Sequence, residues 1–240
     1  MQLSGNTILI TGGASGIGLA LAQRFLQQDN IVIVCGRRED ALKDAAANNP
    51  GLITKRCDLE LQTEREALYT WISTQYPNTN ILINNAGIQN WMNIDEDDFF
   101  QRAQQEIAIN IEAPIHLTKL FLSHKALRTI MNVTSGLSFV PLSKVPVYSA
   151  TKAFFRSFTL SLRYLLKAKN IEVIEIIPPA LNTDLGGKGI HDFAPPVSDF
   201  IETIFTQLAE GKTELTFAFS DAMIKAGPPE LQAAFTRMNP

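Results

Sequence analysis

Short runs of apolar, often β-branched residues alternate along the chain with longer stretches in which apolar residues recur every three or four positions. The first run, Thr-Ile-Leu-Ile-Thr at residues 7–11, is typical of a buried parallel strand. Further runs predict strands at 31–35, 52–57, 80–84, 128–134, 171–177 and 214–219. The helical stretches lie at 16–28, 38–48, 61–76, 98–123, 146–169 and 198–210. Repeated strand-then-helix units of this length predict an α/β fold, a single doubly wound Rossmann-type domain with a seven-stranded parallel sheet and helices on both faces.

The composition is that of an ordinary globular protein, with 45% hydrophobic residues and a net charge of −3. That charge is too close to neutral to suggest a nucleic-acid partner. No apolar run approaches the ~18 residues of a membrane span, and the first residues lack the basic and apolar parts of a signal peptide. We therefore expect a cytoplasmic protein without nucleic-acid or membrane partners.

Cysteines and histidines add little chemistry to this picture. Cys35 and Cys57 fall at strand ends and are expected to be small buried residues rather than a bridge or redox pair. The three histidines have no ligand spacing with carboxylates or cysteines, so no metal site is expected.

A glycine-rich turn, Thr11-Gly12-Gly13-Ala14-Ser15-Gly16-Ile17-Gly18, joins the first strand to the first helix. Strand, turn and helix in this order are the context of a dinucleotide-binding fingerprint. Gly12 permits the tight turn, Gly16 a close backbone approach, and Gly18 close packing of the helix on its strand. The helix N-terminus presents free N–H groups and a positive dipole end to a pyrophosphate. A plain glycine turn is the alternative. The expected contacts here are Gly12, Ser15, Gly16, Ile17 and Gly18.

The end of the second strand indicates which dinucleotide is bound. An acidic residue there would accept hydrogen bonds from a ribose 2′-hydroxyl. The chain instead has Gly36 at that place, followed by Arg37 and Arg38. A planar guanidinium fork suits a 2′-phosphate, so NADP(H) is expected rather than NAD(H). The alternative is a solvated charge pair ahead of the next helix.

Tyr148 and Lys152 lie one helical turn apart on one face of a predicted helix. The pKa of a free tyrosine is about 10, and a neighbouring ammonium is expected to lower it towards the range useful for proton transfer. None of the other three tyrosines has a lysine at this spacing, and Ser135 stands thirteen residues earlier at a strand end. A surface Tyr/Lys pair is the alternative, but a catalytic pair is favoured.

These motifs, together with Asn84-Asn85-Ala86-Gly87 and Asn110, make the chain resemble the short-chain dehydrogenase/reductase family over residues 5–185. The segment Val133-Thr134-Ser135-Gly136-Leu137 and the pair Pro178-Pro179 also resemble the sequences of the DltE-like oxidoreductases. Two departures stand out. The family usually has Pro-Gly where this chain has Pro-Pro, and the connection between Asn110 and Ser135 is a couple of residues short. Neither removes a chemical group.

The resemblance implies a role for each of four catalytic residues. Tyr148 would be the general acid/base. Lys152 would hold the nicotinamide ribose and lower the pKa of the tyrosine. Ser135 would hydrogen-bond the substrate oxygen, and Asn110 would hold a water that links Lys152 to solvent.

The same resemblance extends the cofactor site. Asn84-Asn85-Ala86-Gly87 could be a simple turn after a buried strand, but in the family this segment supports the sheet and lines the cofactor's ribose. Asp58 is expected at the adenine with Leu59, a helix N-cap being the alternative for the aspartate. The remaining expected cofactor contacts are Asn85, Ala86, Gly87, Tyr148, Lys152, Pro178 and Thr183.

The substrate position is expected to be mostly apolar. Gly186-Gly187-Lys188-Gly189 would form a lid over it or an ordinary mobile loop. The residues expected around the reactive atoms, each of which could equally be core packing, are Gln89, Trp91, Leu137, Phe139, Val145, Ala180, Leu181 and Leu185.

The sequence thus predicts an NADP(H)-dependent oxidoreductase that interconverts a small-molecule carbonyl and a secondary alcohol by hydride transfer. A catalytically silent dinucleotide-binding regulatory protein is the alternative, disfavoured because the chain keeps Asn110, Ser135, Tyr148 and Lys152 together. Members of the family pair through the helices expected at 98–123 and 146–169, so a homodimer or homotetramer is expected. The surplus apolar residues that favour this are Phe154, Phe155, Phe158, Leu162 and Leu165.

One domain is expected over 1–240, with 220–240 as a C-terminal helical extension. Pro228-Pro229 opens a run whose apolar residues have the i, i+3, i+4, i+7 spacing of an amphipathic helix: Leu231, Ala234, Phe235 and Met238. We expect this helix to dock across the substrate cleft or onto a neighbouring subunit.

Overall fold

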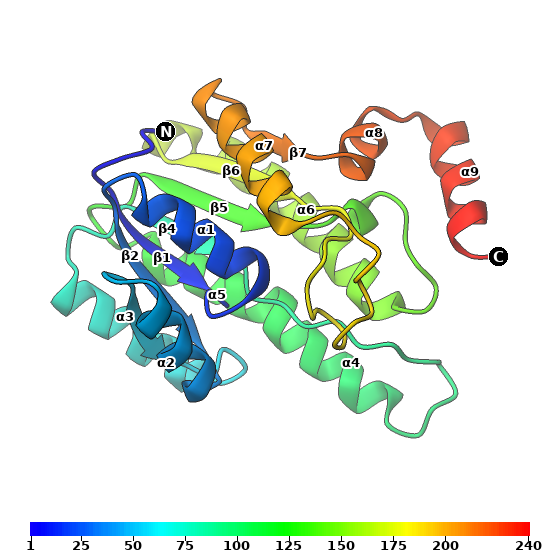
Figure 1. The fold of residues 1–240 in the computed structure, drawn as a ribbon, viewed down its shortest axis with the longest axis horizontal. Helices are drawn as coiled ribbons and strands as arrows, with labels where there is room; N and C mark the ends of the chain where they lie inside the picture. Colours follow the sequence, from blue (N-terminus) through cyan, green and yellow to red (C-terminus); the bar gives the residue numbers. More distant parts are fainter.

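The computed structural model describes all residues from Met1 to Pro240. Its centre is a seven-stranded sheet in the order β3-β2-β1-β4-β5-β6-β7 (Figure 1). Every neighbouring pair of strands is parallel. The strands are β1 (Thr7–Thr11), β2 (Ile31–Gly36), β3 (Ile53–Arg56), β4 (Ile81–Asn84), β5 (Thr129–Val133), β6 (Glu172–Ile177) and β7 (Glu214–Thr216). The fold class predicted from the sequence is confirmed.

Helices cover both faces of the sheet. One face carries α1 (Gly16–Leu26), α2 (Glu39–Asn48) and α7 (Val197–Ala209), and the other carries α3 (Gln62–Gln75), α5 (Ala113–Phe121) and α6 (Pro146–Leu166). None of the helices is both long and apolar enough to span a bilayer.

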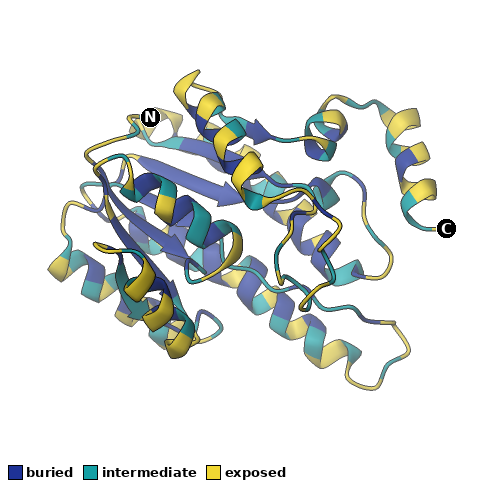
Figure 2. Ribbon diagram, in the orientation of Figure 1, coloured by how far each residue is buried: buried dark blue, intermediate teal, exposed yellow.

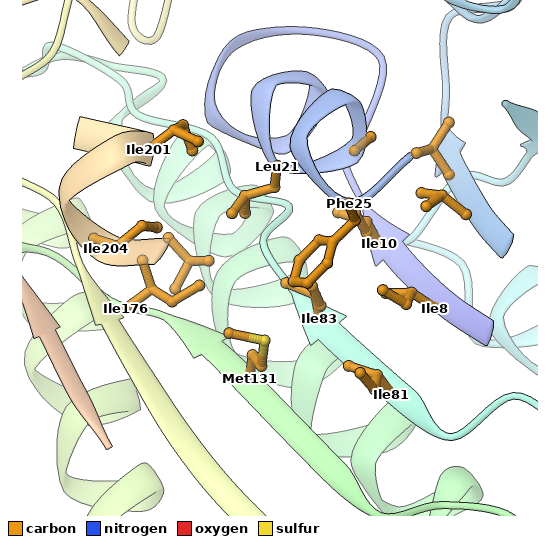
Figure 3. Packing of buried hydrophobic residues seen from close by; sticks show 14 of the residues in the cluster. Ile8, Ile10, Leu21, Phe25, Ile81, Ile83, Met131, Ile176, Ile201 and Ile204 are labelled. Atoms are coloured by element: carbon orange, nitrogen blue, oxygen red, sulfur yellow. The ribbon is translucent and has the colours of Figure 1, made fainter. Parts of the chain in front are cut away.

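Each face has its own apolar core, because successive side chains of a strand point to opposite faces. Ile8 and Ile10 of β1 pack with Leu21 and Phe25 of α1 on one face (Figure 3). Leu9, between them, belongs to the cluster on the other face. The strands at the centre of the sheet are therefore buried on both sides, as their uninterrupted apolar runs predict (Figure 2).

The predicted helix at 98–123 is a continuous helical stretch with a wider turn in its middle. It consists of α4 (Phe99–Ile107), a π-helical turn (Ala108–Glu112) and α5. Pro114 has no N–H to donate to the carbonyl of Asn110 four residues earlier, which accounts for the break in regular α-helical bonding. Asn110 thus sits in an irregular turn that the periodicity of the sequence does not reveal.

The prediction for the seventh strand is wrong at its end. The strand stops at Thr216 instead of residue 219, because the hydroxyl of Ser220 takes the place of the next backbone bond to β6: it accepts from the N–H of Phe217 at 3.0 Å and donates to the carbonyl of Ile177. Ala218 then takes a positive φ of 49°, and α8 (Phe219–Lys225) begins. The amphipathic run after it forms α9 (Pro228–Met238), as its periodicity predicts.

Candidate active site

A single large cavity lies along the carboxyl ends of the strands, with a volume of about 1450 Å³. Residues that follow or end all seven strands line it, which is where doubly wound folds bind ligands. Drug-sized ligands occupy roughly 300–1,000 Å³, so this cavity has room for a dinucleotide beside a second molecule. Of the predicted site residues it is lined by Gly12, Ser15, Gly16, Ile17, Gly18, Arg37, Arg38, Asp58, Leu59, Asn85, Ala86, Gly87, Ser135, Tyr148, Lys152, Pro178 and Thr183.

The glycine turn packs so tightly that side chains are excluded from it. Gly12 has a φ of 64°, and a Cβ there would lie 2.8 Å from Cα of Ala86. A Cβ on Gly18 would lie 2.4 Å from both the Gly12 carbonyl oxygen and Nδ2 of Asn85. The first turn of α1 is therefore held directly against the loop after β4, as the fingerprint interpretation requires.

Thr11 fixes that loop. Its Oγ1 accepts hydrogen bonds from the backbone N–H groups of Asn85 and Ala86, each at 3.0 Å. In return, Nδ2 of Asn85 donates to the carbonyl of Thr11 at 2.8 Å. The segment Asn85-Ala86-Gly87 is thus part of the wall of the cavity and is tied to β1. It is more than the simple turn that was the alternative.

At the β2–β3 edge the cavity is lined by Gly36, Arg37, Arg38 and Asp58. Nη2 of Arg38 donates to Oγ of Ser15 at 3.4 Å, which brings it next to the glycine turn. The Asp58 carboxylate accepts from the N–H of Glu60 at 3.1 Å, and α3 has Leu61 as its N-cap. The helix-cap alternative for Asp58 is therefore wrong.

Asn110 lies behind the cavity wall, where it does not line the open space. Its Oδ1 accepts from the N–H of Ile88 and its Nδ2 donates to the carbonyl of Ile88, both at 2.9 Å. Nδ2 also donates to Oγ1 of Thr151 on α6 at 3.1 Å. A Cβ placed on Gly87 would lie 3.3 Å from Oδ1 of Asn110 and 3.5 Å from Nζ of Lys152, so both side chains converge on this glycine.

Tyr148 and Lys152 stand side by side on α6, and only 5% and 4% of their surfaces are exposed. Nζ of Lys152 donates to the carbonyl of Val133 at 2.9 Å and lies 5.6 Å from the centre of the Tyr148 ring. Ser135 follows β5, and its Oγ accepts from the N–H of Leu137 at 3.1 Å. The structure therefore brings the three side chains together at the cavity and excludes the surface-pair alternative.

The pKa of Tyr148 departs from the sequence-based expectation. Burial of the phenol raises its pKa well above the usual value, and the charge of Glu106 raises it further, while the Ser135 hydroxyl lowers it. Burial also lowers the pKa of Lys152 to about 8. The expected lowering of the tyrosine pKa by the lysine is thus wrong for this structure, because desolvation is the largest influence on the phenol and the only group that lowers its pKa is the Ser135 hydroxyl.

Two residues expected around the substrate do not reach the cavity. Phe139 lies under the guanidinium of Arg156, at 4.4 Å, and packs against the C-terminal helices. Val145 is fully buried just before α6. The others of that group do line the cavity: Gln89, Trp91, Leu137, Ala180, Leu181 and Leu185.

Gly186 lies close over the wall at Gln89 and Trp91, with a Cβ position 3.0 Å from Nε1 of Trp91. Nε1 of Trp91 is buried without a hydrogen-bond partner, as are Nδ2 of Asn90 and Oε2 of Glu106. Glu106 is fully buried on α4, and burial raises its pKa to about 7. The sequence analysis did not single out Glu106. The one feature of the sequence that could have drawn attention to it is its position four residues before Asn110.

The C-terminal region contributes residues that the sequence did not single out for the site. Phe219, at the start of α8, lines the cavity and packs against Gly136, where a Cβ would lie 2.9 Å from its ring. Arg237 and Met238, at the end of α9, also line it. Of these, only Met238 belonged to the apolar stripe from which α9 was predicted.

Comparison with known proteins agrees with this geometry. Residues 6–192 match the family described as short chain dehydrogenase. The chain is 40% identical over 253 aligned positions to the uncharacterized oxidoreductase DltE of Bacillus subtilis (strain 168), covering 100% of this chain and 98% of that protein. It is 30% identical over 177 positions to the NADP-dependent 3-hydroxy acid dehydrogenase YdfG of Escherichia coli (strain K12), covering 71% of each.

In three dimensions the fold resembles that of a short chain dehydrogenase from Burkholderia cenocepacia J2315, solved in complex with NADP. The TM-score is 0.85 at 21% sequence identity, covering 99% of both chains. At this identity the likeness concerns the fold.

Proposed function

The chain belongs to the short-chain dehydrogenase family, and we propose that it is an NADP(H)-dependent oxidoreductase that interconverts a carbonyl and a secondary alcohol by hydride transfer. The observation that carries the proposal is the buried grouping of Tyr148, Lys152 and Ser135 in the cavity that also contains the glycine turn. A silent dinucleotide-binding regulator would have no need of these three side chains and Asn110 in one place.

The residues present fit a dinucleotide. The turn at Gly12 and Gly18 has no room for a Cβ, and the N-terminus of α1 opens into the cavity. Such a turn suits a pyrophosphate, which needs close backbone approach and free N–H groups. Asp58 and Leu59 line the end of the cavity where the adenine would bind. The rest of the cofactor would run past Asn85, Ala86, Gly87, Pro178 and Thr183, which line the same cavity. When bound, the nicotinamide would supply or accept the hydride.

Tyr148 would move the proton. In the reducing direction its Oη donates to the carbonyl oxygen as that oxygen gains negative charge, and in the oxidising direction it takes the proton back from the hydroxyl. Burial keeps the phenol protonated at neutral pH, which suits a donor. The Ser135 hydroxyl, near the phenol, would hold the same substrate oxygen.

Lys152 would supply the positive charge near the ribose. Its pKa of about 8 leaves the ammonium mostly charged at neutral pH, and its bond to the Val133 carbonyl fixes its position. Asn110, held by Ile88 and Thr151 beside Gly87, would keep the water that the family resemblance implies. Each role follows from position and from the family, residue by residue.

The proposed preference for NADP(H) over NAD(H) rests on the residues at the carboxyl end of β2. Gly36 offers no carboxylate to a ribose 2′-hydroxyl, whereas Arg37 and Arg38 line the cavity beside it. A guanidinium pairs well with a phosphate. YdfG, a relative with NADP dependence in its name, supports the same choice.

The mechanism is tested by Tyr148→Phe, assayed on a panel of ketones and secondary alcohols with NADPH and NADP⁺. Loss of the acid/base should lower kcat by roughly 10²–10⁴-fold while the Kd for NADPH stays unchanged. Tyr164→Phe, at an 82% exposed position of the same helix, is the control and should behave as wild type. A Tyr148→Phe enzyme with near-normal kcat would rule out this mechanism.

The cofactor preference is tested by fluorescence titration with NADPH and NADH. Each charge-assisted contact to the 2′-phosphate is worth about 1.5–3 kcal/mol, so NADPH should bind roughly ten- to a hundredfold more tightly. Arg38→Ala should reduce that ratio, whereas Lys43→Ala, an exposed position on α2 away from the cavity, should not. Equal or tighter binding of NADH by the wild type contradicts the proposal.

A further inference from the structure

The last turn of α9 brings a guanidinium to the cavity from outside the proposed cofactor site. Arg237 and Met238 line the same space as Ser135 and Tyr148. The Arg237 side chain is exposed, and none of the ion pairs or side-chain hydrogen bonds of the structure includes it. A free cation at a ligand cavity is available for a ligand's negative charge.

The position of α9 is fixed by contacts to the segment that follows Ser135. Asn239 accepts from the N–H of Ser143 at 2.6 Å and donates to the carbonyl of Pro141 at 3.0 Å. Ala234, on the inner face of the helix, is buried with Val140 and Met223. Arg237 lies between the buried Ala234 and the bonded Asn239, so its backbone is held in place at both ends.

The other charged groups of the cavity are accounted for elsewhere. The Arg37, Arg38 and Asp58 group lies at the β2–β3 edge. Asp184 is next to Thr183, whose side chain lies near Gly16 in the glycine turn. Lys152 is bonded to Val133. The ionisable side chains that line the cavity are Arg37, Arg38, Cys57, Asp58, Tyr148, Lys152, Asp184, His191 and Arg237. Arg237 is therefore the only arginine or lysine of the cavity outside the proposed cofactor and catalytic groups.

Arg237 is also far from the expected position of the 2′-phosphate. The segment that holds α9 follows β5, three strands away from β2, which at ~4.8 Å per strand is about 14 Å. Figure 1 shows α9 and α2 on opposite sides of the molecule. The guanidinium thus belongs to the substrate side of the cavity. The lining that comes from the segment after Ser135 and from α8 and α9 is largely apolar, with Leu137, Leu142, Phe219 and Met238.

We propose that Arg237 determines specificity by pairing with an anionic end group of the substrate, a carboxylate or a phosphate, whose reacting carbonyl lies at Tyr148 and Ser135. The planar fork of arginine donates two parallel hydrogen bonds to either group. The apolar lining from these same segments suits a substrate with an alkyl segment between its carbonyl and its charge. This inference rests on the proposed function and deepens it by naming a substrate class.

The test uses methyl-ketone acids, CH₃–CO–(CH₂)n–COO⁻ with n from 1 to 6, together with their methyl esters and NADPH. The wild type should prefer the acid over the ester by roughly 10–100-fold in kcat/KM at a best chain length. Arg237→Met should abolish that preference mainly through KM and keep kcat on the esters. Arg237→Lys should retain part of it, because the charge remains without the fork. Lys225→Met, at a cation of α8 that pairs with Asp221 and does not line the cavity, is the matched control.

A ketone of the best chain length with a phosphate in place of the carboxylate distinguishes the two anions. The ketone with the natural end group should have the lower KM, and its kcat/KM should fall further in Arg237→Met. An unchanged acid-to-ester ratio in Arg237→Met overturns the inference while the proposed function stands. Calorimetric titration of the NADP⁺-saturated enzyme with the matching alkanoate, which has no reducible carbonyl, measures the pairing without turnover. Equal alkanoate affinity in wild type and Arg237→Met also overturns it. Failure of every carbonyl and alcohol in the panel with both cofactors contradicts the proposed function instead.

Discussion

At the scale of single residues, burial rather than charge sets the proton affinities of the site. The spacing of Tyr148 and Lys152 predicted their closeness correctly. Both side chains are nearly closed off from solvent, so desolvation raises the pKa of the phenol and lowers that of the ammonium. Spacing along a helix reports which side chains meet, but it does not report how much water they lose.

The buried Lys152 makes stability depend on pH. Its pKa is 10.5 when exposed and about 8 in the folded protein, so between these values the unfolded chain binds more protons. Stability should therefore rise with pH above 8. Relative to Lys152→Met, which has no such titration, the free energy of unfolding of the wild type should gain on the order of 2 kcal/mol from pH 7 to pH 9.5.

Urea unfolding of both proteins at several pH values measures this gain. Tyr148 is present in both proteins, so its titration in the unfolded chain is common to both and does not enter the difference. Lys167→Met, at an exposed lysine beyond α6, is the matched control. A flat difference for Lys152→Met would show that the ammonium is not desolvated.

At the scale of elements, a buried polar network ties the end of β5, just before Ser135, to the neighbouring elements. Oγ1 of Thr134 donates to Oε1 of Glu175 on β6 at 2.7 Å. The other oxygen of Glu175 pairs with Arg156 of α6, which also reaches Glu214 of β7 at 3.1 Å. Burial raises the pKa of Glu175 to about 7. The end of β5, β6, β7 and α6 are thus joined immediately behind the site.

Glu175 should make stability fall as pH rises. Its folded pKa of about 7 lies above the ordinary 4.5, so the stability that it contributes is fully present below pH 4.5 and is lost as pH rises through 7. Relative to Glu175→Gln, the wild type should lose on the order of 3 kcal/mol over this interval. Glu214→Gln, at a partly exposed partner of the same arginine, is the matched control in the same unfolding series. Parallel pH profiles for wild type and Glu175→Gln would contradict the assignment.

Regular elements were predictable because their periodicity reflects burial on the sheet. Predicted and observed strands β1–β6 differ by one residue at most at either end. The failures are places where one residue overrides the pattern. Pro114 produces the π-helical turn around Asn110, and the hydroxyl of Ser220 ends β7 at Thr216. Neither interaction has a period, so neither leaves a signal in the alternation of apolar and polar residues.

At the scale of the whole molecule, the site was predictable where a local motif defines it. The glycine turn, Asn85-Ala86-Gly87 and the Tyr148–Lys152 pair are contiguous segments, and all line the cavity. Phe139 and Val145 were wrongly expected there, because position in sequence beside Ser135 and Tyr148 does not decide which way a side chain points. Arg237 comes from more than eighty residues after Tyr148, and only the packing of α9 on residues 139–143 brings it to the cavity.

The surface also carries apolar residues that the fold itself does not use. Of the residues expected to pair subunits, Phe155 and Leu162 are buried, so they belong to the interior. Phe154 and Leu165 of α6 are exposed, and so are Phe100 and Ile107 of α4, which packs against α6. The expected second apolar stripe thus exists, with fewer members of α6 than the sequence suggested and with further residues from α4.

We predict that this α4–α6 surface pairs two copies of the chain about a two-fold axis. A stable interface buries about 800 Å² per partner, which an apolar face spanning two helices can supply. Light scattering at micromolar concentration should give two or four times the chain mass of 26.5 kDa. Phe154→Glu with Leu165→Glu should lower the mass to that of the next smaller assembly, because two carboxylates per subunit would be buried without partners. Ile94→Glu, at an exposed position in the loop before α4, should leave the assembly unchanged. A monomeric wild type, or a double variant that assembles like the wild type, would rule out pairing through this surface.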